Sequence, residues 1–177
     1  MPDITSTSFG LLIAFLLPGL AGLYSFGFWS ARVRRAFDTL WTAQSNVGAF
    51  LLVLLCALTV GLLITVVRWI VFECLLCKKH RLTGQDFGKL STDGKLSSFR
   101  ALADEHYRYH QFWGGMCVAM PPLFIGLVRD NYTNLGGLEL ILFAIGFTVL
   151  ELLTAVAACH AYRNYVDRGK SILGGHN

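Results

Sequence analysis

Four long stretches of this 177-residue sequence contain almost no charged side chain, and this feature constrains the fold more than any other. About 20 mainly apolar residues in helical form are needed to cross the roughly 30 Å hydrocarbon core of a bilayer. The sequence predicts such helices over residues 9–29, 47–76, 111–128 and 138–162. The predicted fold class is therefore all-α, an integral membrane four-helix bundle that forms a single polytopic membrane domain over residues 1–177.

The composition agrees with a chain whose solvent is lipid. Hydrophobic residues make up 54% of the sequence and charged residues 15%, against about 45–50% and about 25% in soluble domains. The mean hydropathy is +0.54. The net charge of +4 is far too small for a nucleic-acid-binding protein. A disordered chain and a soluble globule are excluded by the same numbers.

Prolines interrupt two of the four predicted spans. Pro18 and Gly19 lie in the first span, and Pro121 and Pro122 lie in the third. Helix breaks at matching positions of two halves mark substrate sites in some transporters, because the freed backbone groups face a cavity. Proline is also tolerated in membrane helices and then only kinks them, and we favour this simpler interpretation. The four residues remain candidate helix breaks.

The distribution of Lys and Arg predicts the orientation. With the N-terminus inside, the 77–110 loop and the 163–177 tail hold ten of these residues, and the other side holds four. We therefore expect both termini in the cytoplasm of a multi-pass protein, in the inner (plasma) membrane of a bacterium. Residues 30–46, on the other side, are interpreted as an amphipathic helix in the headgroup layer or as a polar hairpin.

The 77–110 segment is the largest element predicted outside the bilayer. It begins as a loop with glycine turns and becomes helical from about residue 97, where Phe99 and Leu102 begin a helical repeat. We expect this cytoplasmic loop-helix, between transmembrane helices 2 and 3, to dock a protein partner. Five basic residues are the candidate docking contacts: Lys78, Lys79, Arg81, Arg100 and Arg108.

Two charges lie inside the predicted spans, Arg68 in the second and Glu151 in the fourth. A charge in hydrocarbon costs at least about 2.5–3.5 kcal/mol, so such residues usually face protein and find a partner. Both lie at a similar depth, and we expect them to form an intramembrane ion pair within one chain or between subunits. Arg68 also has Glu73 within reach one turn away, or it can extend to the interface. Small and hydroxyl residues on the same helix faces predict close packing: Ala57, Gly61, Thr65, Ala144, Thr148 and Ala155.

Chemistry beyond this pair is weakly indicated. Cys74, Cys77 and His80, with His106 and His110, have the residue types of a metal site, but they would have to converge from several segments. Five histidines are too few for the histidine boxes of membrane di-iron enzymes. The Arg100-x5-His106 spacing resembles that of HEPN-type ribonucleases, without a helical nuclease domain around it. We expect no metal, no cofactor and no catalytic residue.

Three classes of function follow from these features. The first is a non-enzymatic, oligomeric membrane subunit that anchors, senses or perturbs the membrane and docks a cytoplasmic partner. The second is an oligomeric ion channel or small transporter that uses the proline breaks and the Arg68/Glu151 pair. The third, least favoured, is a membrane enzyme. In length and number of spans the chain resembles small four-span subunits of bacterial antiviral defence systems such as Kiwa. The glycines of the predicted spans offer surfaces for close packing, so we expect a homo-oligomer.

Overall fold

The computed structural model describes residues 4–41, 47–76, 82, 93–133 and 136–173. These residues form helices α1 (Ile4–Gly27), α2 (Ala31–Trp41), α3 (Val47–Arg68), α5 (Asp93–Leu102), α6 (Arg108–Asn131) and α7 (Gly137–Ile172). Two segments, η1 (Trp69–Leu76) and η3 (Ala103–Tyr107), are π-helical. The described part of the chain has no strand, and the all-α prediction is confirmed for it.

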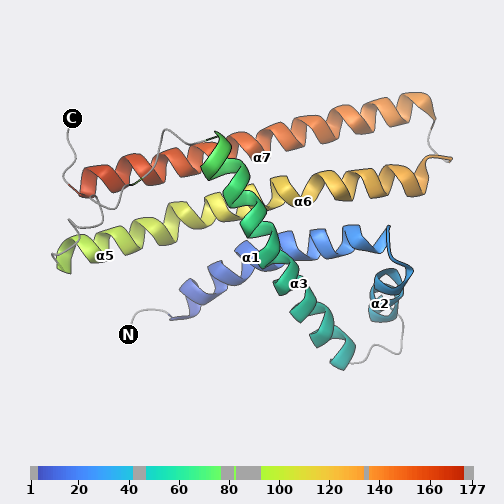
Figure 1. Cartoon of the computed structure of the whole chain (residues 1–177), viewed down its shortest axis with the longest axis horizontal. Coiled ribbons are helices and arrows are strands. Elements are labelled where there is room, and N and C mark those ends of the chain that lie inside the picture. The colour runs from blue at the N-terminus through green and yellow to red at the C-terminus, as the bar shows by residue number, and fades with distance from the viewer. Residues whose placement is uncertain (1–3, 42–46, 77–81, 83–92, 134–135, 174–177) are drawn as a thin grey trace.

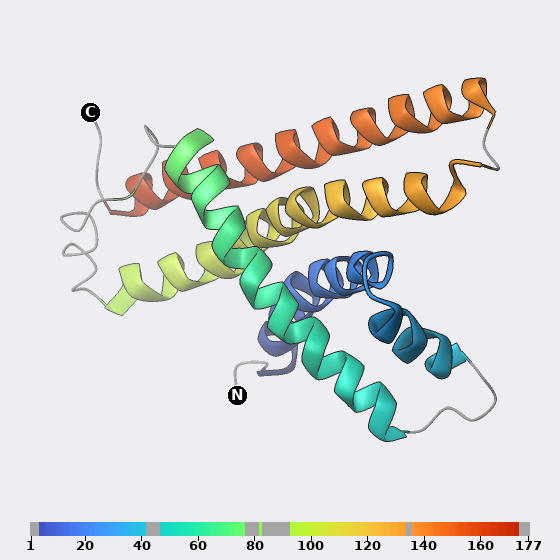
Figure 2. The same cartoon turned by 45° about the vertical axis from the view of Figure 1, so that its right-hand side comes forward.

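Helices α1, α6 and α7 run side by side, and α3 crosses them at a steep angle (Figures 1 and 2). Helix α1 packs against both α3 and α6, and α7 packs on α6. Helix α5 and the start of α6 lie at one end of the molecule, and α2 lies at the other. We refer to these as the α5 end and the α2 end.

The lengths and hydropathies of the helices mark the chain as a membrane protein. Three helices of the described residues are long and apolar enough to cross a bilayer: Val47–Leu76, Arg108–Asn131 and Gly137–Ile172. A fourth crossing is obtained if the bent pair Leu12–Gly27 and Ala31–Asp38, which meet at 119°, counts as one span. Helix α2 therefore turns away sharply at the end of α1.

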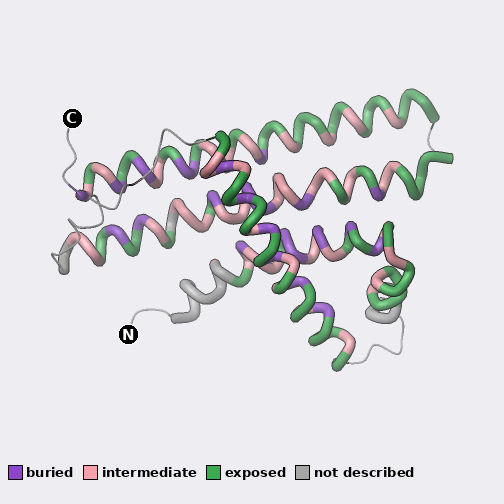
Figure 3. Tube along the Cα trace, in the orientation of Figure 1, coloured by how far each residue is buried: buried purple, intermediate pink, exposed green. Residues whose placement is uncertain are grey.

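Small residues allow α1 and α3 to cross with their backbones in contact. A Cβ atom added to Gly19 would lie closer than 2.5 Å to the Ala57 carbonyl oxygen, and one added to Gly61 would also lie closer than 2.5 Å to the Phe15 carbonyl oxygen. Ala57 has an exposed fraction of 0%. Figure 3 shows buried positions at this crossing and also at the α5 end of the molecule, while the half of α7 farther from the α5 end is mostly exposed.

The prolines do not end their helices. Helix α1 continues as an α-helix through Pro18, and α6 continues through Pro121 and Pro122. Pro18 is fully buried and packs on Gly115 of α6, where its ring fills the space that a side chain would need. Departures from α-helical bonding occur elsewhere, in η1 and η3.

At the α5 end the chain builds a small helical unit on α7. Helices α5 and η3 continue directly into α6, and they pack on the last four turns of α7. Phe99 and Leu102 of α5 are buried against Leu173, and Tyr162 and Val166 of α7 are buried with Tyr107 beside them. The segment from residue 93 thus has a small core, which it shares with α7. Helix α7 extends to Ile172, so most of the predicted 163–177 tail is helical.

Candidate functional site

The two π-helical segments meet at one buried cluster of polar side chains. Arg68 and Glu73 come from the junction of α3 and η1, Tyr107 ends η3, and His110 lies in the first turn of α6. Single wide turns of this kind are rare inside α-helices and occur often at functional sites. The cluster is therefore our candidate functional site.

Glu73 is the centre of the cluster. The Arg68 guanidinium donates from Nη1 to Glu73 Oε1 at 3.2 Å, and the Tyr107 hydroxyl donates to the same oxygen at 3.2 Å. The side chains of Arg68 and Glu73 are only 2% and 12% exposed. Arg68 also lies over the Tyr107 ring, 5.8 Å from its centroid. Arg68 and Glu73 are thus both removed from water. Their mutual attraction and the hydrogen bond from the neutral Tyr107 hydroxyl compensate this burial, as a buried ion pair requires.

His110 joins the cluster to α7. Its Nδ1 lies 2.9 Å from the Ala158 carbonyl oxygen, and since a carbonyl only accepts, Nδ1 carries the proton. Its Nε2 lies 3.8 Å from Glu73 Oε1 and has no hydrogen-bond partner among the described residues. The ring is completely buried and lies 4.9 Å from the ring of Tyr162. The imidazole of His110 thus lies between the Glu73 carboxylate and the backbone of α7.

Burial raises the pKa of the Tyr107 hydroxyl, and the nearby Glu73 carboxylate raises it further. Both effects disfavour a phenolate beside an existing negative charge. Tyr107 consequently stays protonated and acts as a donor to Glu73. The cluster therefore holds the Glu73 carboxylate between the Arg68 guanidinium and the Tyr107 hydroxyl.

The glycine at position 114 makes room for Arg68. A Cβ atom on Gly114 would lie 2.9 Å from both Cγ and Cδ of Arg68. The arginine side chain therefore runs along the surface of α6, in a groove that only glycine leaves open. Neither the composition of α6 nor its periodicity identifies this role for Gly114.

Glu151 lies in a second, smaller polar contact. The Cys117 thiol donates to Glu151 Oε1 at 2.9 Å, and Glu151 Oε2 is buried without a hydrogen-bond partner among the described residues. Within this chain Arg68 thus binds Glu73 and not Glu151. This pairing is the alternative that the sequence left open. Helix α6 lies between the two, with Gly114 against Arg68 and Cys117 against Glu151. A pairing between subunits stays a prediction.

The predicted packing residues divide into two groups. Ala57 and Gly61 are buried at the α1 crossing, and Thr65 donates to the Gly61 carbonyl of its own helix. On α7 the buried positions are Thr154, Ala158, Ala161, Tyr162, Val166 and Gly169. The three predicted there are more open: Ala144 and Ala155 are half-buried, and Thr148 is exposed and donates to the carbonyl of Ala144.

The predicted docking residues also separate. Arg100 is exposed on α5, while Arg108 is largely covered and binds Asp104 at 2.6 Å. Lys78, Lys79 and Arg81 lie outside the described residues. Among the described residues, no three His, Cys, Asp or Glu side chains gather as a metal site. His106 instead accepts from Arg168 of α7.

Comparisons with known proteins give no relative: no family model, curated protein or solved structure matches this chain.

Proposed function

We propose that the chain is a non-enzymatic, oligomeric membrane subunit that docks a cytoplasmic protein through the helical unit at its α5 end. In this proposal α1, α3 with η1, α6 and α7 are the four crossings of a bundle, and both termini lie in the cytoplasm. The Lys and Arg of the flanks support this orientation. The role in bacterial antiviral defence implied by the resemblance in length and number of spans belongs to the same proposal, and plaque counts with and without the gene test it.

The length of α7 is the observation that carries the proposal. Its 36 residues make a helix of about 54 Å, whereas the hydrocarbon core is about 30 Å thick. Roughly 24 Å of α7 therefore extends beyond the lipid. This part is covered on one side by α5 and η3 and buries Tyr162, Val166 and Leu173. A protein that only anchored itself would not need a packed unit outside the bilayer.

The charges on this unit favour an acidic partner. Arg100 of α5 and Arg163 and Arg168 of α7 are exposed there. Ser98, Ala101 and Ser171 lie beside Arg168 around a shallow depression of about 470 Å³. Basic side chains around a small-residue surface attract carboxylates of a partner and steer its approach.

The membrane-level face of α7 supports self-association. Its large apolar side chains point away from α6 and are exposed, among them Ile141, Ile145, Leu152 and Val156. Gly146 lies to one side of this face, beside the groove between α6 and α7. Van der Waals packing drives the association of helices in lipid, so a second copy of α7 can pack on this apolar face.

Co-purification from membranes tests the docking proposal. Arg100→Glu combined with Arg163→Glu should remove the cytoplasmic protein that co-purifies with the unchanged chain. Arg35→Glu, a change of an exposed arginine at the α2 end, is the matched control and should leave co-purification unchanged. Equal recovery of the protein with both variants would contradict the proposal.

Transport of an ion is the second candidate function, because two buried polar atoms besides Arg68 Nε have no hydrogen-bond partner among the described residues. These are Glu151 Oε2 and His110 Nε2, which face the interior from α7 and α6. Buried polar atoms of this kind in membrane helices often mark an ion path. Ion flux through the reconstituted protein that Glu151→Gln abolishes would favour this candidate. Flux equal to that of protein-free vesicles would exclude it.

A further inference from the structure

A pocket of about 370 Å³ opens where α1 meets the start of α6, away from the buried cluster. Its lining combines one positive side chain, one negative side chain and a ring of apolar and aromatic groups. The lining includes Gly10 and Ile13 of α1 together with Asp104, Arg108, Phe112 and Trp113.

The depth of this pocket matches the lipid headgroups. Helix α6 has 24 residues and is about 36 Å long, which exceeds the hydrocarbon core by about 6 Å. Arg108 is its first residue, so its side chain lies at the level of the lipid phosphates. Phe112 and Trp113 lie about one turn deeper, where acyl chains and glycerol begin, and aromatic rings are common at this level.

The two charges are ordered along the membrane normal. Arg108 lies nearer the hydrocarbon, and Asp104 lies about one helical turn farther out. They bind each other through one nitrogen and one oxygen, Nη2 and Oδ1. A guanidinium has five N–H donors and a carboxylate has two oxygens, so both groups can still bind a ligand. The Asp104 side chain is half exposed, while Arg108 is covered and lies against Gly10 of α1.

We propose that this pocket binds a zwitterionic phospholipid with a primary amine, of the phosphatidylethanolamine type. In such a lipid the phosphate is next to the glycerol and the ammonium is farther out, in the same order as Arg108 and Asp104. The guanidinium binds the phosphate, for which its planar donors are well suited. The Asp104 carboxylate accepts from the ammonium N–H groups. One acyl chain lies along Ile13, Phe112 and Trp113.

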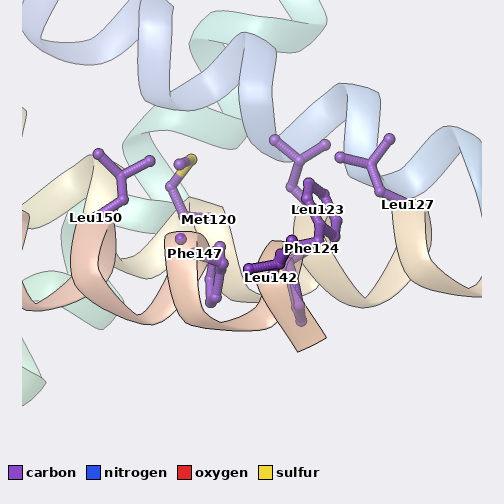
Figure 4. Close-up of a pocket in the computed structure, with 9 residues that line it drawn as sticks. Met120, Leu123, Phe124, Leu127, Leu142, Phe147 and Leu150 are labelled. Atoms are coloured by element: carbon purple, nitrogen blue, oxygen red, sulfur yellow. The ribbon is translucent and has the colours of Figure 1, made fainter. Parts of the chain in front are cut away.

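The headgroup chemistry separates this lipid from its relatives. The choline headgroup has the same phosphate but no N–H donor for Asp104. Phosphatidylglycerol has no positive group and would leave Asp104 beside a net negative lipid. The groove between α6 and α7 is a useful contrast, because all nine side chains or glycines that line it are apolar (Figure 4). That groove of about 330 Å³ gives no reason to prefer one headgroup.

Lipid retention by the purified full-length protein tests the proposal. The protein in a neutral detergent is mixed with phosphatidylethanolamine, phosphatidylcholine or phosphatidylglycerol of identical acyl chains, and bound lipid is counted by native mass spectrometry. We expect about tenfold tighter binding of phosphatidylethanolamine, the effect of one additional charged hydrogen bond. Equal binding of the three lipids, or tighter binding of phosphatidylglycerol, would overturn the proposal.

Variants assign the preference to the two charges. Asp104→Asn should bring phosphatidylethanolamine down to the level of phosphatidylcholine, and Arg108→Gln should weaken both. The exchange Asp104→Arg with Arg108→Asp allows an ion pair but reverses the order of charges, and it should also lose the preference. Asp130→Asn, which breaks the exposed pair with Arg34 at the α2 end, is the control and should bind like the unchanged protein. A preference that survives Asp104→Asn would refute the assignment.

Discussion

The crossing of α1 and α3 gives the sharpest test of the packing. In Gly61→Ala the new methyl group would lie closer than 2.5 Å to the backbone carbonyl oxygen of Phe15. Ordinary contact begins near 3.4 Å, so the helices must separate by about 0.9 Å or more. A backbone oxygen cannot rotate away as a side chain can. We expect a loss of about 1–3 kcal/mol, the usual range for overpacking.

Thermal unfolding in mild detergent, followed by fluorescence-detected size exclusion, measures this loss. Gly146→Ala is the matched control, because nothing lies near its Cβ position. Alanine is the better helix former by about 1 kcal/mol, so the control should be unchanged or slightly stabilised. Gly19→Ala acts at the same crossing, and the double variant should lose less than the sum, since one separation relieves both contacts. If Gly61→Ala were as stable as Gly146→Ala, the two backbones would not meet as described.

Three further predictions concern the polar contacts. Arg68→Leu should destabilise the protein by about 3–5 kcal/mol because it leaves Glu73 buried without its cation, and Arg68→Leu with Glu73→Leu should recover most of the loss in the same unfolding assay. Cys117→Ala should cost about 1–3 kcal/mol by removing the donor to Glu151, whereas Cys117→Ser should cost less because it keeps a donor; equal losses would contradict the bond. The pKa of Tyr107 is raised above its usual value of 10.0 in the folded protein. The stability that its hydroxyl contributes is therefore fully present below pH 10.0 and is lost as the pH rises through the higher pKa of the folded state. Tyr107→Phe should therefore be less stable than the unchanged protein at neutral pH, and its stability should fall less when the pH is raised into the alkaline range. If the two proteins lost stability in parallel as the pH rises, this prediction would be refuted.

The extent of the helices follows from simple patterns in the sequence. Apolar stretches near residues 47–76 and 138–162 predict helices because lipid requires every backbone group to bond within its own segment. The periodicity of Phe99 and Leu102 likewise predicts a helix from about residue 97, and α5 begins somewhat earlier, at Asp93. The effect of the prolines is harder to predict from the sequence. A proline removes one hydrogen bond of its helix, but packing against the neighbouring helix determines whether the helix bends. Pro18 packs on Gly115, a contact that no local pattern contains.

Which helices touch is a matter of tertiary packing, and periodicity does not contain it. The small-residue stripe on α3 was expected to meet the stripe on α7, but Ala57 and Gly61 pack on α1. Helix α6 occupies the space beside both α3 and α7, and its glycine at position 114 accepts the Arg68 side chain. Matching depths of Arg68 and Glu151 therefore did not bring them together within the chain.

The partner of Arg68 is determined by the kind of helix between the two residues. In an α-helix, residues five apart point about 140° away from each other, so Arg68 and Glu73 would lie on different faces. In a π-helix the bonding runs from i to i+5 and brings such residues onto nearly the same face. Because η1 begins at Trp69, Glu73 comes to lie under the Arg68 guanidinium. A deletion of one residue in η1, such as Val71, should restore α-helical bonding and place Arg68 and Glu73 four residues apart. That spacing also puts two side chains on the same face of an α-helix, so the pair should survive this deletion.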